Sequence, residues 1–154
     1  MDTAAELTFA DGVYRFWLPL PQVIELERRC GQRGDDGKLH PKSVVTIFDG
    51  LNDSLGLQDD NLVWIGGGAI HPSEVNEVLR LALIGGNSGP DGEVGPVRAG
   101  ELVALYGYPA RPLIEVAGLA WRVLRAAILG IEVKKKDVTG EADDKPTKRS
   151  KKGP

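Results

Sequence analysis

The chain has 154 residues, of which 42% are hydrophobic and 6% aromatic, with a formal net charge of −3 at pH 7. That length allows one modest hydrophobic core. Residues 134–154 carry eight Lys or Arg against four Asp or Glu, a net charge of +4, so −7 remains on residues 1–133. An acidic body argues against general affinity for nucleic-acid phosphates, and we expect no nucleic-acid partner.

The sequence predicts a single helical domain over residues 1–133 and a charged, flexible tail over residues 134–154. The tail mixes both signs of charge and lacks aromatic side chains, which is typical of a solvated segment. No signal peptide is visible at the N-terminus, and no apolar run approaches the ~18–20 residues needed to span a bilayer. We therefore expect no membrane partner and a cytosolic location.

A β-hairpin is predicted over residues 7–18. The dipeptide Asp11-Gly12 is a strong turn signal, and apolar residues alternate on both sides of it. An isolated hairpin is marginally stable, so its apolar face must pack on helices or pair with the edge of another chain. The hairpin edge is thus a candidate surface for self-association. Trp17 lies out of register with the apolar face and would mark an interface if it is exposed.

Helical periodicity dominates the rest of the chain, with proline or glycine bounding each segment. Ser73 is expected to cap one of these helices, and Gly85-Gly86 to end it. Residues 62–65 are predicted as either a short strand or an irregular turn. The fold class is therefore mainly α (α+β), an N-terminal hairpin followed by a compact bundle of four to five short helices. The predicted helices cover residues 21–30, 41–55, 73–84, 97–106 and 112–129.

Few residues could carry chemistry. His40 and His71 each precede a proline and lack the neighbouring carboxylates or cysteines of a metal-ligand pattern. Because Cys30 is the only cysteine in the sequence, an internal disulfide is excluded. We expect Cys30 to be partly buried near a helix end. The adjacent Arg28 and Arg29 leave open a reactive thiol, because positive neighbours lower a thiol pKa.

Two further patterns suggest sites that the spacing does not support. Gly66-Gly67-Gly68 and Gly85-Gly86 lack the Lys-Ser/Thr of a phosphate loop, and the second pair follows a helix instead of opening one. The aspartates between residues 49 and 60 lack the glycine and terminal glutamate of a calcium loop. We expect no enzyme activity, cofactor or metal; an enzyme or metal-dependent regulator built on the histidines and aspartates stays as an alternative.

Residues 20–130 resemble the gene-transfer-agent family of phage tail proteins, now usually read as tail assembly chaperones. The resemblance rests on LPLPQVIELERRCG, on EVNEVLRLALIGG ending at Gly86, on Glu101-Leu102-Val103 and on the helix from Pro112 to Gly130. Each motif is made of common residues, and their order and spacing together carry the likeness. Residues 58–71 and the chain after Val133 have no counterpart in these motifs.

The resemblance implies a protein, made in the cytoplasm of the host bacterium, that binds the tape measure protein and recruits tail tube subunits. An older description of the family, a structural tail tube component, is the alternative. One hairpin among helices does not supply the larger β-sandwich that a ring-forming tube subunit normally needs.

Candidate protein-binding side chains are large or charged residues on otherwise apolar elements. The arginines among them could equally pair with glutamates of their own fold on solvated helix faces. The candidates are Trp17, Arg80, Trp121, Arg122 and Arg125.

Overall fold

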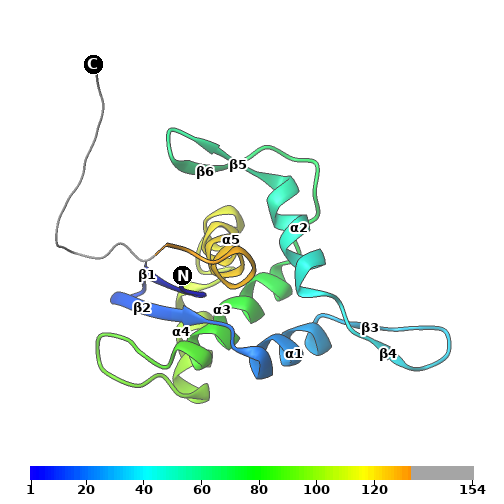
Figure 1. Cartoon of the computed structure of the whole chain (residues 1–154), viewed down its shortest axis with the longest axis horizontal. Coiled ribbons are helices and arrows are strands. Elements are labelled where there is room, and N and C mark those ends of the chain that lie inside the picture. The colour runs from blue at the N-terminus through cyan, green and yellow to red at the C-terminus, as the bar shows by residue number, and fades with distance from the viewer. Residues whose placement is uncertain (133–154) are drawn as a thin grey trace.

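The structure, a computed structural model, describes residues 1–132. The tail predicted over residues 134–154 lies outside the described residues. In the described part, an N-terminal hairpin packs with five helices, so the predicted fold class is confirmed (Figure 1). The strands are β1 (Ala4–Phe9), β2 (Gly12–Trp17), β3 (Gln32–Arg33), β4 (Leu39–His40), β5 (Leu55–Gln58) and β6 (Asn61–Trp64); the helices are α1 (Leu20–Arg29), α2 (Val44–Ser54), α3 (Pro72–Gly86), α4 (Pro96–Tyr106) and α5 (Leu113–Leu129).

The first hairpin turns one residue earlier than the Asp11-Gly12 signal predicts. Phe9 pairs with Gly12, so the turn residues are Ala10 and Asp11, and Ala10 takes a left-handed φ of 56°. Gly12 is needed for another reason: a Cβ at this position would collide with the ring of Pro90 in the loop before α4. The glycine therefore allows close packing of that loop on β2.

The core lies between the β1–β2 hairpin and helices α3, α4 and α5. Helix α3 is central, because it packs against β2, α1, α4 and α5. Alternation along β2 buries Tyr14 and Phe16 on the face toward the helices, where Phe9 packs edge-to-face against both rings. The largest fully buried apolar side chains are Phe9, Phe16, Leu26, Leu79, Leu83, Leu102 and Leu124.

Helix α3 starts and ends differently from the prediction. His71 occupies the N-cap without a side-chain hydrogen bond, so the expected cap by Ser73 is wrong. Proline at the first helical position fixes φ at a helical value and has no N–H that needs a partner, which makes a side-chain cap less necessary. At the other end Asn87 takes the left-handed C-cap conformation, with a φ of 50°.

Gly85 and Gly86 belong to α3 and do not stop it. A Cβ on Gly85 would collide with the backbone carbonyl of Trp17, and one on Gly86 with the carbonyl of Arg15. The pair therefore lets α3 lie directly on β2. A helix stop and a close helix–strand approach give the same Gly-Gly pattern in sequence, and only the packing distinguishes them.

Two small hairpins were not predicted, although β6 confirms the short-strand alternative for residues 62–65. The loop over residues 32–40 contains the β3–β4 ribbon, and residues 55–64 form the β5–β6 hairpin at the end of α2. Asp59 and Asp60 make the turn between β5 and β6 with φ values of 52° and 66°. Aspartate tolerates the left-handed region better than most residues, so two aspartates can form this turn without glycine. No helix within residues 1–132 is long and apolar enough to cross a membrane.

Candidate functional site

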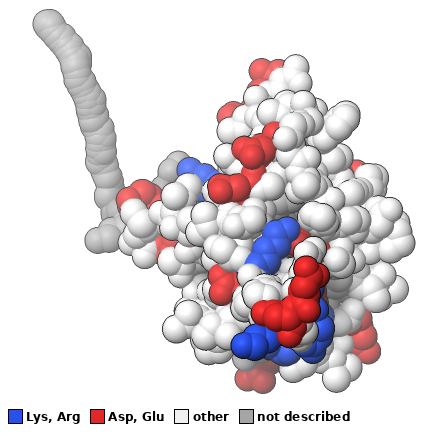
Figure 2. Space-filling view, turned by 90° about the vertical axis from the view of Figure 1, so that its right-hand side faces the viewer, with Lys and Arg blue, Asp and Glu red and all other residues white. Residues whose placement is uncertain are grey.

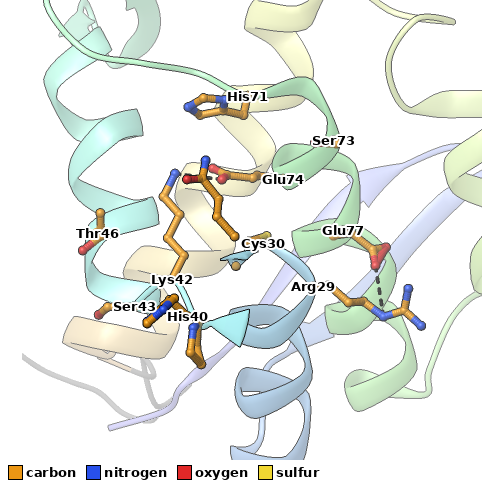
Figure 3. A pocket seen from close by; sticks show the side chains of 13 residues that line it. Arg29, Cys30, His40, Lys42, Ser43, Thr46, His71, Ser73, Glu74 and Glu77 are labelled. Atoms are coloured by element: carbon orange, nitrogen blue, oxygen red, sulfur yellow. Dashed lines mark hydrogen bonds and ion pairs between the residues drawn. The ribbon is translucent and has the colours of Figure 1, made fainter. Parts of the chain in front are cut away.

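A polar pocket of about 730 Å³ lies between α1, α2, α3 and the β3–β4 ribbon (Figure 3). Its central feature is an ion pair: Lys42 Nζ lies 2.7 Å from Glu74 Oε2, and both side chains are largely shielded from solvent. Glu27 of α1 also holds the start of α2, because its carboxylate accepts a hydrogen bond from the Val44 amide at 2.9 Å. The pocket is thus built where three helices are tied together by charged side chains.

Cys30 lines the same pocket as the C-cap of α1. Burial raises the pKa of its thiol to about 12, and the negative charges of Glu74 and Glu77 act in the same direction. The adjacent Arg28 and Arg29 do not offset this, since both are bound to Glu25 at 2.7 and 2.6 Å. A reactive thiol needs a lowered pKa, and the pKa shift here is in the opposite direction. This environment therefore keeps the Cys30 thiol protonated.

The fold brings His40 and His71 to the same pocket, although they are 31 positions apart in the chain. His40 is exposed and lies 3.3 Å from Asp36 of its own ribbon. Within residues 1–132, no three His, Cys, Asp or Glu side chains are grouped as a metal site would need. Because the lysine and glutamate at the centre already satisfy each other, the arrangement suits a structural junction better than a catalytic centre.

Trp121, a predicted binding residue, is tied to the fold. Its indole N–H donates to Asn52 Oδ1 at 3.1 Å, and its ring stacks on Phe48 with centroids 6.3 Å apart. Both partners are on α2, so Trp121 fastens α2 to α5. The guanidinium of Arg125 lies 5.8 Å from the Trp121 ring on the solvent side.

Arg80 and Trp17 are also engaged within the chain. Arg80 Nε donates to Glu77 Oε2 at 2.6 Å, one of the internal pairings that the sequence left open. Trp17 is half-buried on the outer face of β2, where its N–H donates to Thr3 Oγ1 and the Arg15 guanidinium lies 5.1 Å from its ring. These contacts leave less of either side chain for a partner.

Arg122 is a candidate for which no internal hydrogen bond or ion pair is found within residues 1–132. It is exposed on α5 and lines a shallow groove of about 280 Å³ together with Arg111 and Glu115. Gly118 lies in this groove next to Leu62 of β6. The five candidates therefore do not form one site: they are spread over β2, α3 and α5.

The most exposed aromatic side chain in the described chain was not predicted as a site. Trp64 at the end of β6 is 65% exposed, and its neighbours Leu57 and Ile65 are 64% and 63% exposed. The apolar residues on both sides of Asp59-Asp60, in residues 55–57 and 62–65, were the signal that could have located the hairpin. The exposure of Trp64 could not be predicted from the sequence, because apolar residues in a strand pattern are normally expected to be buried.

Comparison with protein-family models, with curated proteins and with solved structures finds no match for this chain. The observations that bear on function are therefore the exposed surfaces of the chain and the sequence motifs that resemble the tail protein family. Those motifs fall on α1, α3, α4 and α5, which together make up most of the helical body.

Proposed function

We propose that this chain is a phage or gene-transfer-agent tail assembly chaperone that binds the tape measure protein and assists tail tube assembly in the host cytoplasm. The observation that supports the proposal best is the pair of large exposed apolar side chains, Leu57 and Trp64, that lie on one face of the β5–β6 hairpin. Exposed apolar side chains grouped on one protruding element are typical of a protein-binding surface. The proposed partner, the tape measure protein, comes from the resemblance of the sequence motifs to the tail assembly chaperone family.

The physical task of such a chaperone is to cover apolar stripes on a long helical client before assembly. A groove or face that receives an amphipathic helix does this by burying the apolar stripe while leaving the polar side in water. Leu57 and Trp64, which share one face of the β5–β6 hairpin, offer apolar area for this purpose. Further partners in this proposal are tail tube subunits and a second copy through the edge of the β1–β2 hairpin.

The alternative function is a structural tail component. Each sheet in the described residues has only two strands, and a tube wall needs a larger sheet that can continue between subunits. The backbone just before β1 is also paired within the chain, because Asp2 and Ile131 exchange two hydrogen bonds at 2.9 and 2.8 Å. These features favour the chaperone.

The test is co-expression with the tape measure protein encoded in the same gene cluster. We expect the tape measure protein to stay in the soluble fraction and to co-purify with this chain, and purified particles to lack the chain. Failure to bind the tape measure protein, combined with stoichiometric presence in particles, would overturn the proposal in favour of the structural component.

A further inference from the structure

The β5–β6 hairpin has a sheet face that the rest of the described chain covers only in part. Leu55 pairs with Trp64 and Leu57 with Leu62, so these four side chains share one face. Leu55 is buried, and Leu62 packs beside Gly118 of α5. The other two, Leu57 and Trp64, are each about two-thirds exposed, at 64% and 65%. The hairpin therefore uses half of its apolar face to join the body and leaves half open.

Two other apolar side chains of this region are exposed but lie outside the Leu57 and Trp64 face. Ile65, directly after β6, lies over Gly56 on the opposite face of the hairpin and is 63% exposed. Val45 in the first turn of α2 is also exposed. We call α2, β5, β6 and Ile65, that is residues 44–65, the lobe. In Figure 1 the β5–β6 end of the lobe protrudes above the helical body.

The charge of the lobe has one sign. Residues 43–79 contain no Lys or Arg, and the lobe carries four exposed aspartates. None of the four lies within ion-pair distance of a cation in residues 1–132. In Figure 2 the top of the molecule accordingly shows red and white atoms and no blue ones. The four are Asp49, Asp53, Asp59 and Asp60.

We infer that the lobe docks a basic amphipathic helix of a partner protein. The apolar stripe of that helix covers Leu57 and Trp64, and its flanking Lys or Arg side chains face the four aspartates. A nucleic acid or an anionic membrane would meet the four carboxylates of the lobe, whereas the cations Arg111 and Arg122 line the groove beside Leu62, on the side that joins the body. A second copy that used the same surface would bring eight carboxylates together without a cation, which disfavours that contact.

The chain's own residues 134–154 supply the right charge but not the right apolar content. They carry a net +4 yet contain only Val138 and Ala142 as apolar side chains other than proline. Such a segment would neutralise aspartates and leave Trp64 uncovered. A separate partner, with both an apolar stripe and a basic rim, matches both properties of the lobe.

The chemistry of this partner follows from the lobe alone. Its assignment to a segment of the tape measure protein deepens the proposed function and rests on it. The experiment below therefore uses a defined peptide, so that the surface is tested without the tape measure protein.

The probe is a fluorescein-labelled model peptide of about 15 residues, the length at which an amphipathic peptide begins to be helical in water. Leucine lines one helical face and lysine the other; a matched peptide has glutamate in place of every lysine. Fluorescence anisotropy with the full chain is expected to show at least about tenfold tighter binding of the lysine peptide, weakening as salt increases. Equal binding of both peptides would overturn the inference.

Variants then locate the contact. Trp64→Ser with Leu57→Ser is expected to weaken lysine-peptide binding by about tenfold or more, because exposed aromatic and aliphatic anchors dominate such contacts. Val97→Ser, at an apolar residue of α4 that is 77% exposed, is the matched control and should leave affinity unchanged. Since all three side chains are exposed, folding should be retained, with circular dichroism as the check. An equal effect of the control would overturn the inference.

Asparagine replacements test the charge. Changing Asp49, Asp53, Asp59 and Asp60 to Asn is expected to reduce lysine-peptide affinity by several-fold and to flatten its salt dependence. Asn keeps the left-handed turn at residues 59 and 60 accessible. Asp35→Asn with Asp91→Asn is the control, since both residues are exposed but lie outside the lobe. An unchanged salt dependence in the fourfold variant would contradict the charge argument.

Two further measurements separate the alternatives. If changing the lysines of residues 134–154 to Gln in the full chain shifts the Trp64 indole NMR signal, the chain's own segment is the occupant and the inference is overturned; an unshifted signal supports it. If the full chain binds the tape measure protein and the Trp64/Leu57 variant binds it equally well, the surface is wrong while the proposed function stands. If the lysine peptide binds the chain but the tape measure protein does not, the proposed function is wrong and the inferred binding surface stands.

Discussion

The helical body and the lobe differ in how they use apolar side chains. In the body, Leu79 and Leu83 of α3 are fully buried, and the helix lies so close to β2 that only glycine fits at its end. In the lobe, the apolar side chains toward the body are buried, whereas Leu57 and Trp64 are more than 60% exposed. The body thus holds the fold together, and the outer side of the lobe can change without loss of the core. Because Leu57 and Trp64 are exposed side by side on one hairpin face, that face is a better candidate for binding than the buried faces of the apolar helices.

The largest effect is expected from a leucine pair that tests this contrast directly. Leu79→Ala should lower the free energy of unfolding by about 2–5 kcal/mol, because it leaves a cavity at the centre of α3. Leu57→Ala removes the same atoms from an exposed site and should cost less than about 0.5 kcal/mol. Urea denaturation measures both. Equal losses would show that the lobe surface is part of the core.

A glycine pair should give the next largest effect. Gly86→Ala places a methyl group against the Arg15 carbonyl, and we expect a loss of about 2–3 kcal/mol as α3 moves away from β2. Gly100→Ala is the matched control: it lies inside α4 with no atom within 4 Å of the added Cβ, and should stabilise by about 0.5–1 kcal/mol. A neutral Gly86→Ala would contradict the close approach.

Removing the contact of Trp121 with α2, which joins the lobe to the helical body, should have a smaller and local effect on stability. Trp121→Phe keeps a ring beside Phe48 but removes the hydrogen bond to Asn52, at an expected cost of about 0.5–1 kcal/mol. Hydrogen exchange should become faster in α2 while the amides of α3 keep their protection. Asn52→Ala should reproduce the effect. Uniformly faster exchange would mean that body and lobe open as one unit.

The smallest effect at neutral pH concerns Cys30, at the junction between α1, α2 and α3. Its thiol pKa is about 12 in the folded chain against an ordinary value of 9.0, so the folded state keeps a proton that the unfolded chain loses. This contribution to stability is fully present below pH 9 and is lost as pH rises from about 9 to about 12. The stability difference between the wild type and Cys30→Ala should therefore change only in that range. Rapid alkylation by iodoacetamide at pH 7 would contradict a protonated thiol.

Much of the fold could be predicted because local periodicity carries it. The apolar positions of α3 that the sequence identifies, such as Val75, Val78 and Leu79, are all buried. The β1–β2 hairpin and the long α5 were predicted for the same reason. The β5–β6 hairpin was missed because its turn, Asp59-Asp60, lacks glycine and because Leu55 continues the helical spacing of α2.

The candidate binding residues were less predictable. Arg80 and Trp121 look like free side chains on apolar helices in the sequence, yet Glu77 and Asn52 engage them. The Arg80–Glu77 pair is local, at a spacing of three residues, and could be anticipated. The Trp121–Asn52 contact joins residues 69 positions apart and depends on how α2 crosses α5.

By itself the sequence determined the five helices and the first hairpin of the described residues, together with the acidic charge of residues 1–133, because these depend on composition and on spacings within one or two turns. Tertiary structure alone decided that Gly85-Gly86 is a contact with β2, that Cys30 is kept protonated, and that Trp64 faces solvent. Each of these depends on which distant backbone or charge lies beside the residue. Burial and contact across the chain are properties of the packed molecule, and no local pattern specifies them.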